Sequence, residues 1–177
     1  MSVSVVVAPE HKVAKFGALK IFLAGGITNC IDWQKMIIDN FQKTNNYNVC
    51  LFNPRRKNFD IKKDSAEEQI IWEFNAIEKC DLFTMYFDGG ISDQPICLYE
   101  LGRNIERMKQ RFPDDWMDRI VITCDAKYKR VEDVIIQTRL ATEDKVKVNV
   151  IDDINKSVDF HYNNICKSIE NLSDYGI

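Results

Sequence analysis

The sequence lacks several features that would assign a broad class of function at once. No apolar run approaches the roughly twenty residues that cross a bilayer, and the N-terminus lacks the basic stretch and long apolar core of a secretory signal. The formal net charge of −3 gives no reason to expect a surface for DNA or RNA. No repeat, low-complexity tract or linker divides the chain. We expect a soluble, cytoplasmic protein with a single domain over residues 1–177, whose partners include neither a membrane nor a nucleic acid polymer.

The cysteines and histidines do not form any familiar reactive arrangement. None of the 6 cysteines forms a C-x-x-C pair, as a zinc site would require, and a disulfide scaffold suits a smaller secreted chain. We interpret all six as buried free thiols and expect no metal. His11 and His161 lie in the terminal segments, where we expect them on the surface, and a catalytic triad is not indicated. The turn from Gly25 to Cys30 matches neither the dinucleotide fingerprint nor a Walker A loop, so no cofactor is expected.

Short apolar strands alternate with amphipathic helices along the chain. Strands are predicted over residues 20–24, 48–52, 81–87, 119–123 and 146–151, and helices over residues 32–42, 65–80, 95–111, 131–141 and 154–172. This alternation predicts an α/β fold, a doubly wound parallel sheet of about five strands in the order 2-1-3-4-5 with helices on both faces. Residues 2–8 could add an N-terminal edge strand. Ligands of such sheets bind beyond the carboxyl ends of the strands, here between the first and third core strands.

Glu100 is the most informative residue. Four apolar residues precede it and a leucine follows it, so its carboxylate cannot easily avoid burial. Burial of an unpaired carboxylate is costly, whereas a desolvated carboxylate held ionised is what a glycosyl nucleophile requires. The alternative is that Glu100 pairs with Arg103 or Asn104 on an exposed face.

Glu73 repeats this anomaly on the preceding helix. The predicted apolar stripe there is Ile70, Phe74 and Ile77, and Glu73 borders it with Gln69 one turn earlier. The two polar side chains could orient a sugar hydroxyl or a base, or Glu73 could be a half-buried structural carboxylate.

Two further segments end predicted strands at the ligand-binding edge. Asn53, Arg55 and Arg56 follow the second core strand, and the arginines could hold a phosphate or form a solvated basic turn. Gly25 and Gly26 end the first core strand, where backbone N–H groups could approach a ligand.

Five segments in order resemble the nucleoside 2-deoxyribosyltransferase-like family. They are Lys20-Ile-Phe-Leu-Ala-Gly-Gly26, Phe52-Asn-Pro-Arg-Arg56, Gln69-Ile-Ile-Trp-Glu73, Cys80-Asp81 and Tyr99-Glu-Leu-Gly-Arg103, within about residues 19–125. The resemblance implies a flavodoxin-like (Rossmann-like) fold, a retaining double displacement on a nucleoside or nucleotide, and a homo-oligomer.

The resemblance also implies residue roles. Glu100 occupies the position of the glutamate that attacks the anomeric carbon, and Glu73 that of the acid that positions the sugar or assists proton transfer. Gly25 and Gly26 would line the base pocket. Six positions before Glu100 the chain carries Gln94, with Asp93 beside it, where close relatives carry aspartate or serine.

We therefore expect a deoxyribosyltransferase or related N-glycosidase that acts on a nucleoside or its monophosphate. A nucleoside monophosphate remains an option as substrate because of Arg55, Arg56 and Arg103, which could bind its phosphate. The alternatives are a hydrolase of the nicotinamide–ribosyl bond of NAD and a non-catalytic nucleotide-binding module in which Glu100 only accepts hydrogen bonds from ribose.

Overall fold

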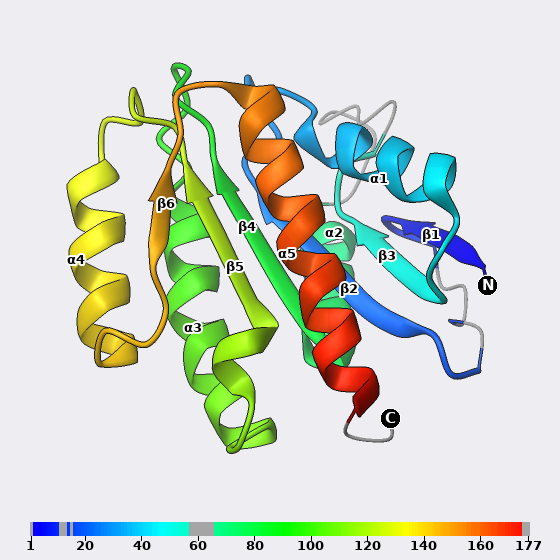
Figure 1. Cartoon of the computed structure of the whole chain (residues 1–177). Helices are drawn as coiled ribbons and strands as arrows, with labels where there is room; N and C mark the ends of the chain where they lie inside the picture. The colour runs from blue at the N-terminus through cyan, green and yellow to red at the C-terminus, as the bar shows by residue number, and fades with distance from the viewer. Residues whose placement is uncertain (1, 11–13, 15, 57–65, 175–177) are drawn as a thin grey trace.

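The computed structural model describes residues 2–10, 14, 16–56 and 66–174, and its strands form one parallel sheet (Figure 1). The strands are Val3–Val7 (β1), Leu19–Gly25 (β2), Val49–Asn53 (β3), Leu82–Phe87 (β4), Ile120–Cys124 (β5) and Val148–Val150 (β6). Within the described residues their order is β1-β3-β2-β4-β5-β6. With β1 set aside, this is the predicted order 2-1-3-4-5, and β1 adds the expected edge strand beside β3. The predicted doubly wound sheet is confirmed.

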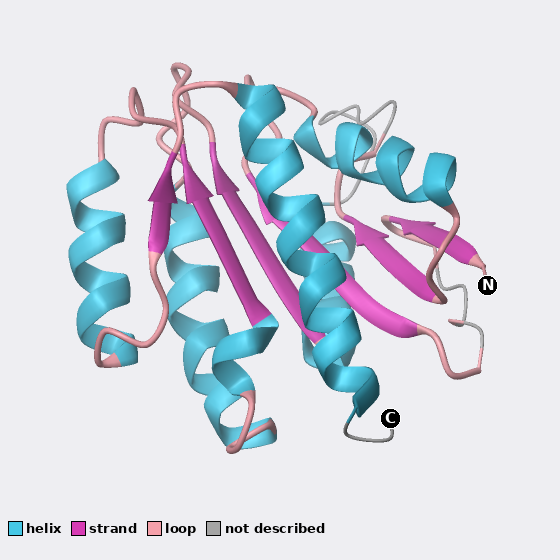
Figure 2. Cartoon of the chain, viewed as in Figure 1, coloured by secondary structure: helices cyan, strands magenta, loops and turns pink. Residues whose placement is uncertain are grey.

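Helices cover both faces of the sheet (Figure 2). They are Trp33–Thr44 (α1), Ala66–Lys79 (α2), Pro95–Arg111 (α3), Val131–Thr142 (α4) and Ile154–Asp174 (α5), with a short, unpredicted 3-10 helix, Trp116–Arg119 (η1), before β5. Helices α1 and α5 pack on one face and α2, α3 and α4 on the other. Because side chains alternate along a strand, Ile21 of β2 packs with the first group and Phe22 with the second.

Two helix starts follow from local chemistry. The Asp32 carboxylate accepts a hydrogen bond from the Lys35 backbone N–H at 3.0 Å and so caps α1. Helix α3 begins at Pro95, as predicted, because proline suits the first helical turn. The predicted cap of α2, Ser65, lies outside the described residues.

Helix α2 presents a different face to the core from the one predicted. Ile70 and Phe74, two of the three expected core positions, are 63% and 50% exposed. The helix instead buries Trp72, whose ring centroid lies 6.4 Å from that of Phe22 and 6.2 Å from that of Phe52. An indole buries more apolar area than any other side chain, and its insertion turns Ile70 and Phe74 toward the surface.

His161 is not a surface residue, and that prediction is wrong. Its ring is fully buried, its centroid lies 4.9 Å from that of Trp33, and its Nε2 is 2.7 Å from Thr123 Oγ1. Burial lowers the pKa of His161 from 6.5 to about 3, so the ring is neutral. His11 lies outside the described residues.

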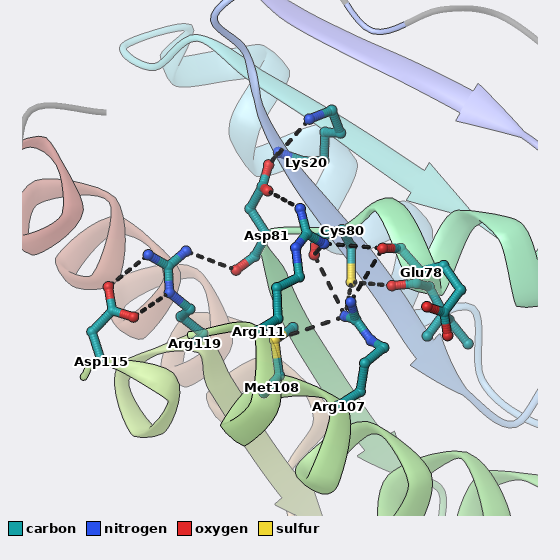
Figure 3. A network of polar contacts seen from close by, with 10 residues as sticks. Lys20, Glu78, Cys80, Asp81, Arg107, Met108, Arg111, Asp115 and Arg119 are labelled. Carbon is teal, nitrogen blue, oxygen red and sulfur yellow. Dashed lines mark hydrogen bonds and ion pairs between the residues drawn. The ribbon is translucent and has the colours of Figure 1, made fainter. Parts of the chain in front are cut away.

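The last carbonyl groups of α2 are bound by arginines from α3 (Figure 3). Arg111 donates to the Glu78 and Cys80 carbonyl oxygens at 3.0 Å and 2.9 Å, and Arg107 donates to that of Glu78 at 3.2 Å. Carbonyl groups at a helix C-terminus have no partner within the helix. These contacts therefore tie the end of α2 to α3.

Asp81, the residue before β4, connects this network to the sheet (Figure 3). Its carboxylate accepts from the Lys20 backbone N–H at 3.0 Å and from Arg111 at 3.2 Å. Arg119 is 2% exposed and donates to the Asp115 carboxylate at 2.8 Å and 2.6 Å and to the Asp81 carbonyl at 3.2 Å. A buried guanidinium requires such partners, so the network holds α2, α3 and the start of β4 together.

Within the described residues, no helix combines the length and apolar character needed to cross a bilayer.

Candidate active site

A cavity of about 250 Å³ lies at the carboxyl end of β2, beside the start of α3. It is lined by Phe22, Ala24, Gly25, Gly26, Ile27, Thr28, Pro54, Glu73, Ser92, Ile96, Cys97 and Glu100. The lining thus comes from the end of β2, the loop after β3, the middle of α2 and the segment after β4. This is the edge of the sheet at which the strand order reverses, where ligand binding was expected.

The turn after β2 requires glycine at two consecutive positions. Gly25 has φ +150°, and a Cβ there would lie 2.6 Å from the Tyr86 carbonyl oxygen. A Cβ on Gly26 would overlap the side chains of Cys30 and Gln94. The backbone of this turn forms one wall of the cavity.

Glu100 faces the cavity from the first half of α3. Burial and, next, the charge of Glu73 raise the pKa of Glu100 to about 8, and Arg103 offsets only part of this. Glu100 therefore does not form the exposed pair with Arg103 or Asn104 that the sequence left as the alternative. Arg103 pairs with Glu78, and Asn104 donates to the backbone carbonyl of Glu100 at 2.8 Å.

Glu73 reaches the same cavity from α2. Burial raises its pKa, while a hydrogen bond from Gln69 and the charge of Arg56 lower it. Two carboxyl groups with different surroundings therefore face one small cavity. Such an arrangement can supply a nucleophile and a proton-transfer group to the same substrate.

Arg55 and Asn53 hold the glycine turn in place and do not line the cavity. Arg55 donates to the carbonyl oxygens of Gly26 at 3.0 Å and of Ile31 at 2.9 Å. Asn53 is 8% exposed, and its side-chain oxygen accepts from the Arg55 backbone N–H at 3.0 Å. The basic turn considered from the sequence is thus engaged with the protein's own backbone.

Gln94 and Asp93 also lie outside the cavity lining. The Gln94 side chain is 4% exposed and bridges the backbone of Asp88, accepting from its N–H at 3.1 Å and donating to its carbonyl at 2.8 Å. Asp93 is exposed and pairs with Lys129. Gln94 therefore shapes the loop between β4 and α3, and Asp93 points to another part of the surface.

Arg103 points toward α2 and does not line the cavity. Its guanidinium pairs with Glu78 and lies 4.0 Å from the centre of the Phe74 ring. Its charge lowers the pKa of Glu100, three residues earlier on the same helix, without a hydrogen bond between the two side chains.

The sequence did not single out eight of the residues that line the cavity, which are Phe22, Ala24, Ile27, Thr28, Pro54, Ser92, Ile96 and Cys97. Thr28 and Ser92 lie in loops that follow strand ends, where many polar residues occur and few reach the site. Cys97 precedes Glu100 by three residues and so shares its helix face, a signal that the sequence did contain.

The cysteines and the described acidic residues do not gather into a metal site. No group of three or more His, Cys, Asp or Glu side chains that could hold a metal ion occurs among the described residues. All six cysteines are free, and five are buried as predicted. Cys30, in the loop between β2 and α1, is only partly buried.

Comparison with known protein families places the cavity within one matched region. A family model described as nucleoside 2-deoxyribosyltransferase like matches residues 18–112. That range contains every residue that lines the cavity, from Phe22 to Glu100. No curated protein matches the chain.

Proposed function

Because the chain belongs to the nucleoside 2-deoxyribosyltransferase-like family, we propose that it cleaves or exchanges the bond between base and sugar of a nucleoside. Glu100 is the proposed nucleophile and Glu73 the proposed proton-transfer residue. The observation that carries the proposal is that both carboxyl groups, from separate helices, line one cavity at the switch point of the sheet.

The proposed reaction has two displacements at the anomeric carbon. The Glu100 carboxylate forms a bond to this carbon as the bond to the base breaks, and the departing base takes a proton. A second base or a water molecule then attacks the same carbon and releases Glu100. Attack by a base makes the protein a transferase, and attack by water makes it a hydrolase.

The charges around the cavity favour a neutral nucleoside over its monophosphate. No lysine or arginine is among the described residues that line it. The arginines considered for a phosphate, Arg55, Arg56 and Arg103, donate to Gly26, Gln69 and Glu78 respectively. At about 250 Å³ the cavity is at the small end of ligand pockets, which also favours one nucleoside over a dinucleotide.

We further propose that the protein is a homo-oligomer. Apolar side chains of α2 and α3 are exposed beside the cavity, with Ile70 at 63%, Phe74 at 50%, Ile96 at 62% and Tyr99 at 68%. Ile96 itself lines the cavity. Large apolar side chains exposed on two helices that contact each other are typical of a protein interface.

The test is a panel of ribonucleosides, deoxyribonucleosides, their monophosphates and NAD, each incubated with and without an acceptor base. We expect free base from a nucleoside, and a new nucleoside when an acceptor is present. Glu100→Gln should reduce base release roughly 10³-fold or more, since it removes the nucleophile. Mass spectrometry of the wild-type protein should detect a sugar adduct on Glu100.

The matched control is Glu106→Gln, the same substitution on the exposed side of α3, where Glu106 pairs with Lys109. It should leave base release unchanged. Unaltered base release by Glu100→Gln would overturn the proposed mechanism. Retained nucleoside binding with no base release by the wild-type protein would instead favour the binding module.

A further inference from the structure

The side chain of Gln69 lies between Arg56 and Glu73. Its Oε1 accepts a hydrogen bond from Arg56 Nε at 2.6 Å. Its Nε2 donates to Glu73 Oε1 at 2.7 Å and to the Pro54 carbonyl oxygen at 2.8 Å. The reversed amide would set an NH₂ group against the Arg56 donor and an oxygen against two acceptors. Arg56 thus determines that Gln69 presents a donor to Glu73.

The two glutamates consequently have unequal surroundings. Glu73 receives the amide N–H of Gln69 and the positive charge of Arg56, both of which favour its ionised form. Among the described residues, no donor forms a hydrogen bond with the Glu100 carboxylate. The charged groups that act on Glu100 are Glu73, across the cavity, and Arg103, whose guanidinium is paired with Glu78.

We propose that Arg56 and Gln69 are positioning residues that hold Glu73 ionised, so that the resting pair of glutamates carries one proton and carries it on Glu100. This arrangement leaves one negative charge in the cavity, whereas two ionised carboxylates in a partly buried site would repel each other. Burial and the charge of Glu73 raise the pKa of Glu100 to about 8, which agrees with a protonated Glu100 at neutral pH.

The single proton is the one that the reaction needs. Its transfer from Glu100 to Glu73 creates the nucleophile. The bond from the Glu100 oxygen to the anomeric carbon then forms, the bond to the base breaks, and Glu73 gives the proton to the departing base. The site carries one negative charge before this step and one after the base has left, and in both states the charge is on Glu73. This use of the proton rests on the function proposed above. The location of the proton on Glu100 in the protein without substrate does not.

The location can be measured without a substrate. In the whole protein labelled with ¹³C at glutamate side-chain carboxyl groups, the resonances are assigned with Glu73→Gln and Glu100→Gln and titrated by NMR. We expect Glu73 to ionise at lower pH than Glu100. Gln69→Met, which keeps the length but removes the donor, should move the lower titration step upward by about one pH unit.

Two comparisons separate positioning from general damage. Arg56→Met should move the lower step in the same direction, and Arg56→Lys, which keeps a donor and a charge, should restore part of the wild-type value. Gln137→Met, the same change at an exposed position of α4, should have no effect. An unmoved lower step in Gln69→Met, or wild-type ionisation of Glu100 before Glu73, would overturn the proposal.

The pH dependence of base release completes the test. Gln69→Met should shift the acidic limb of the kcat profile upward by the same amount as the NMR titration and lower kcat more than it changes KM. A loss of rate without a shifted limb would contradict the proposed proton relay, even if Glu100→Gln abolishes base release and the proposed function stands. If the wild-type protein releases no base, the proposed function fails, while the NMR titration still decides where the proton lies.

Discussion

At the scale of single residues, Glu100 combines a proposed catalytic role with a cost in stability. Its pKa in the folded protein is about 8, above the ordinary value of 4.5. Between pH 4.5 and about pH 8, the folded protein therefore keeps a proton on Glu100 that the unfolded protein has lost. The stability that this proton provides is fully present below pH 4.5 and is lost as the pH rises toward 8. The charged carboxylate is tolerated in the fold, not favoured by it.

Glu100→Gln should consequently stabilise the protein increasingly as the pH rises. Glutamine has nearly the same shape as glutamate and does not ionise. The free energy of unfolding of the variant therefore lacks this pH dependence. The difference between variant and wild type should grow between pH 5 and pH 8 by up to about 1.4 kcal/mol per pH unit. Urea unfolding at several pH values measures it, with Glu106→Gln as the control expected to show no such trend. A difference that stays constant with pH would contradict the burial described for Glu100.

At the scale of elements, α2 carries Glu73 and Gln69 and is held at its far end by arginines of α3. Arg111→Met removes the donors to the Glu78 and Cys80 carbonyl groups and the ion pair with Asp81. We expect a loss of about 1–2 kcal/mol in the free energy of unfolding, because the Glu78 and Cys80 carbonyl groups then keep only the hydrogen bonds from Arg107, at 3.2 Å and 3.5 Å.

Arg130→Met is the matched control for this prediction. Arg130 forms a surface ion pair with Asp133 in which both side chains are 55% exposed, and such pairs contribute little. Chemical denaturation of the two variants should therefore differ clearly. Equal losses would show that Arg111 does not hold the end of α2.

At the scale of the whole molecule, the exposed apolar surface of α2 and α3 predicts assembly. Light scattering after size exclusion should give a mass above the 20.6 kDa of one chain. Ile70→Glu places a charge on this surface and should shift the protein toward the monomer. Leu140→Glu is the control, because Leu140 of α4 is 64% exposed and Ile70 is 63% exposed. A wild-type protein that is monomeric at high concentration would refute the proposed oligomer.

The sequence by itself determined the order and type of the elements and the positions of the two glutamates. Element type depends on local periodicity, and a parallel sheet with right-handed crossovers leaves few strand orders. Glu100 was recognisable because it interrupts an apolar segment, and Glu73 because it stands beside apolar residues of its helix, although two of these, Ile70 and Phe74, are exposed. Both lie on helices that border the carboxyl edge of the sheet, and the structure brings them to one cavity.

Only the tertiary structure decided which partners the polar side chains choose and which side of a helix is buried. Arg55 binds the carbonyl groups of a turn more than twenty residues earlier, and His161 is buried against Trp33 of another helix. The rotation of α2 depends on Trp72 packing against Phe22 of β2 and Phe52 of β3. These outcomes are set by competition among segments distant in the chain, and local periodicity contains no information about that competition.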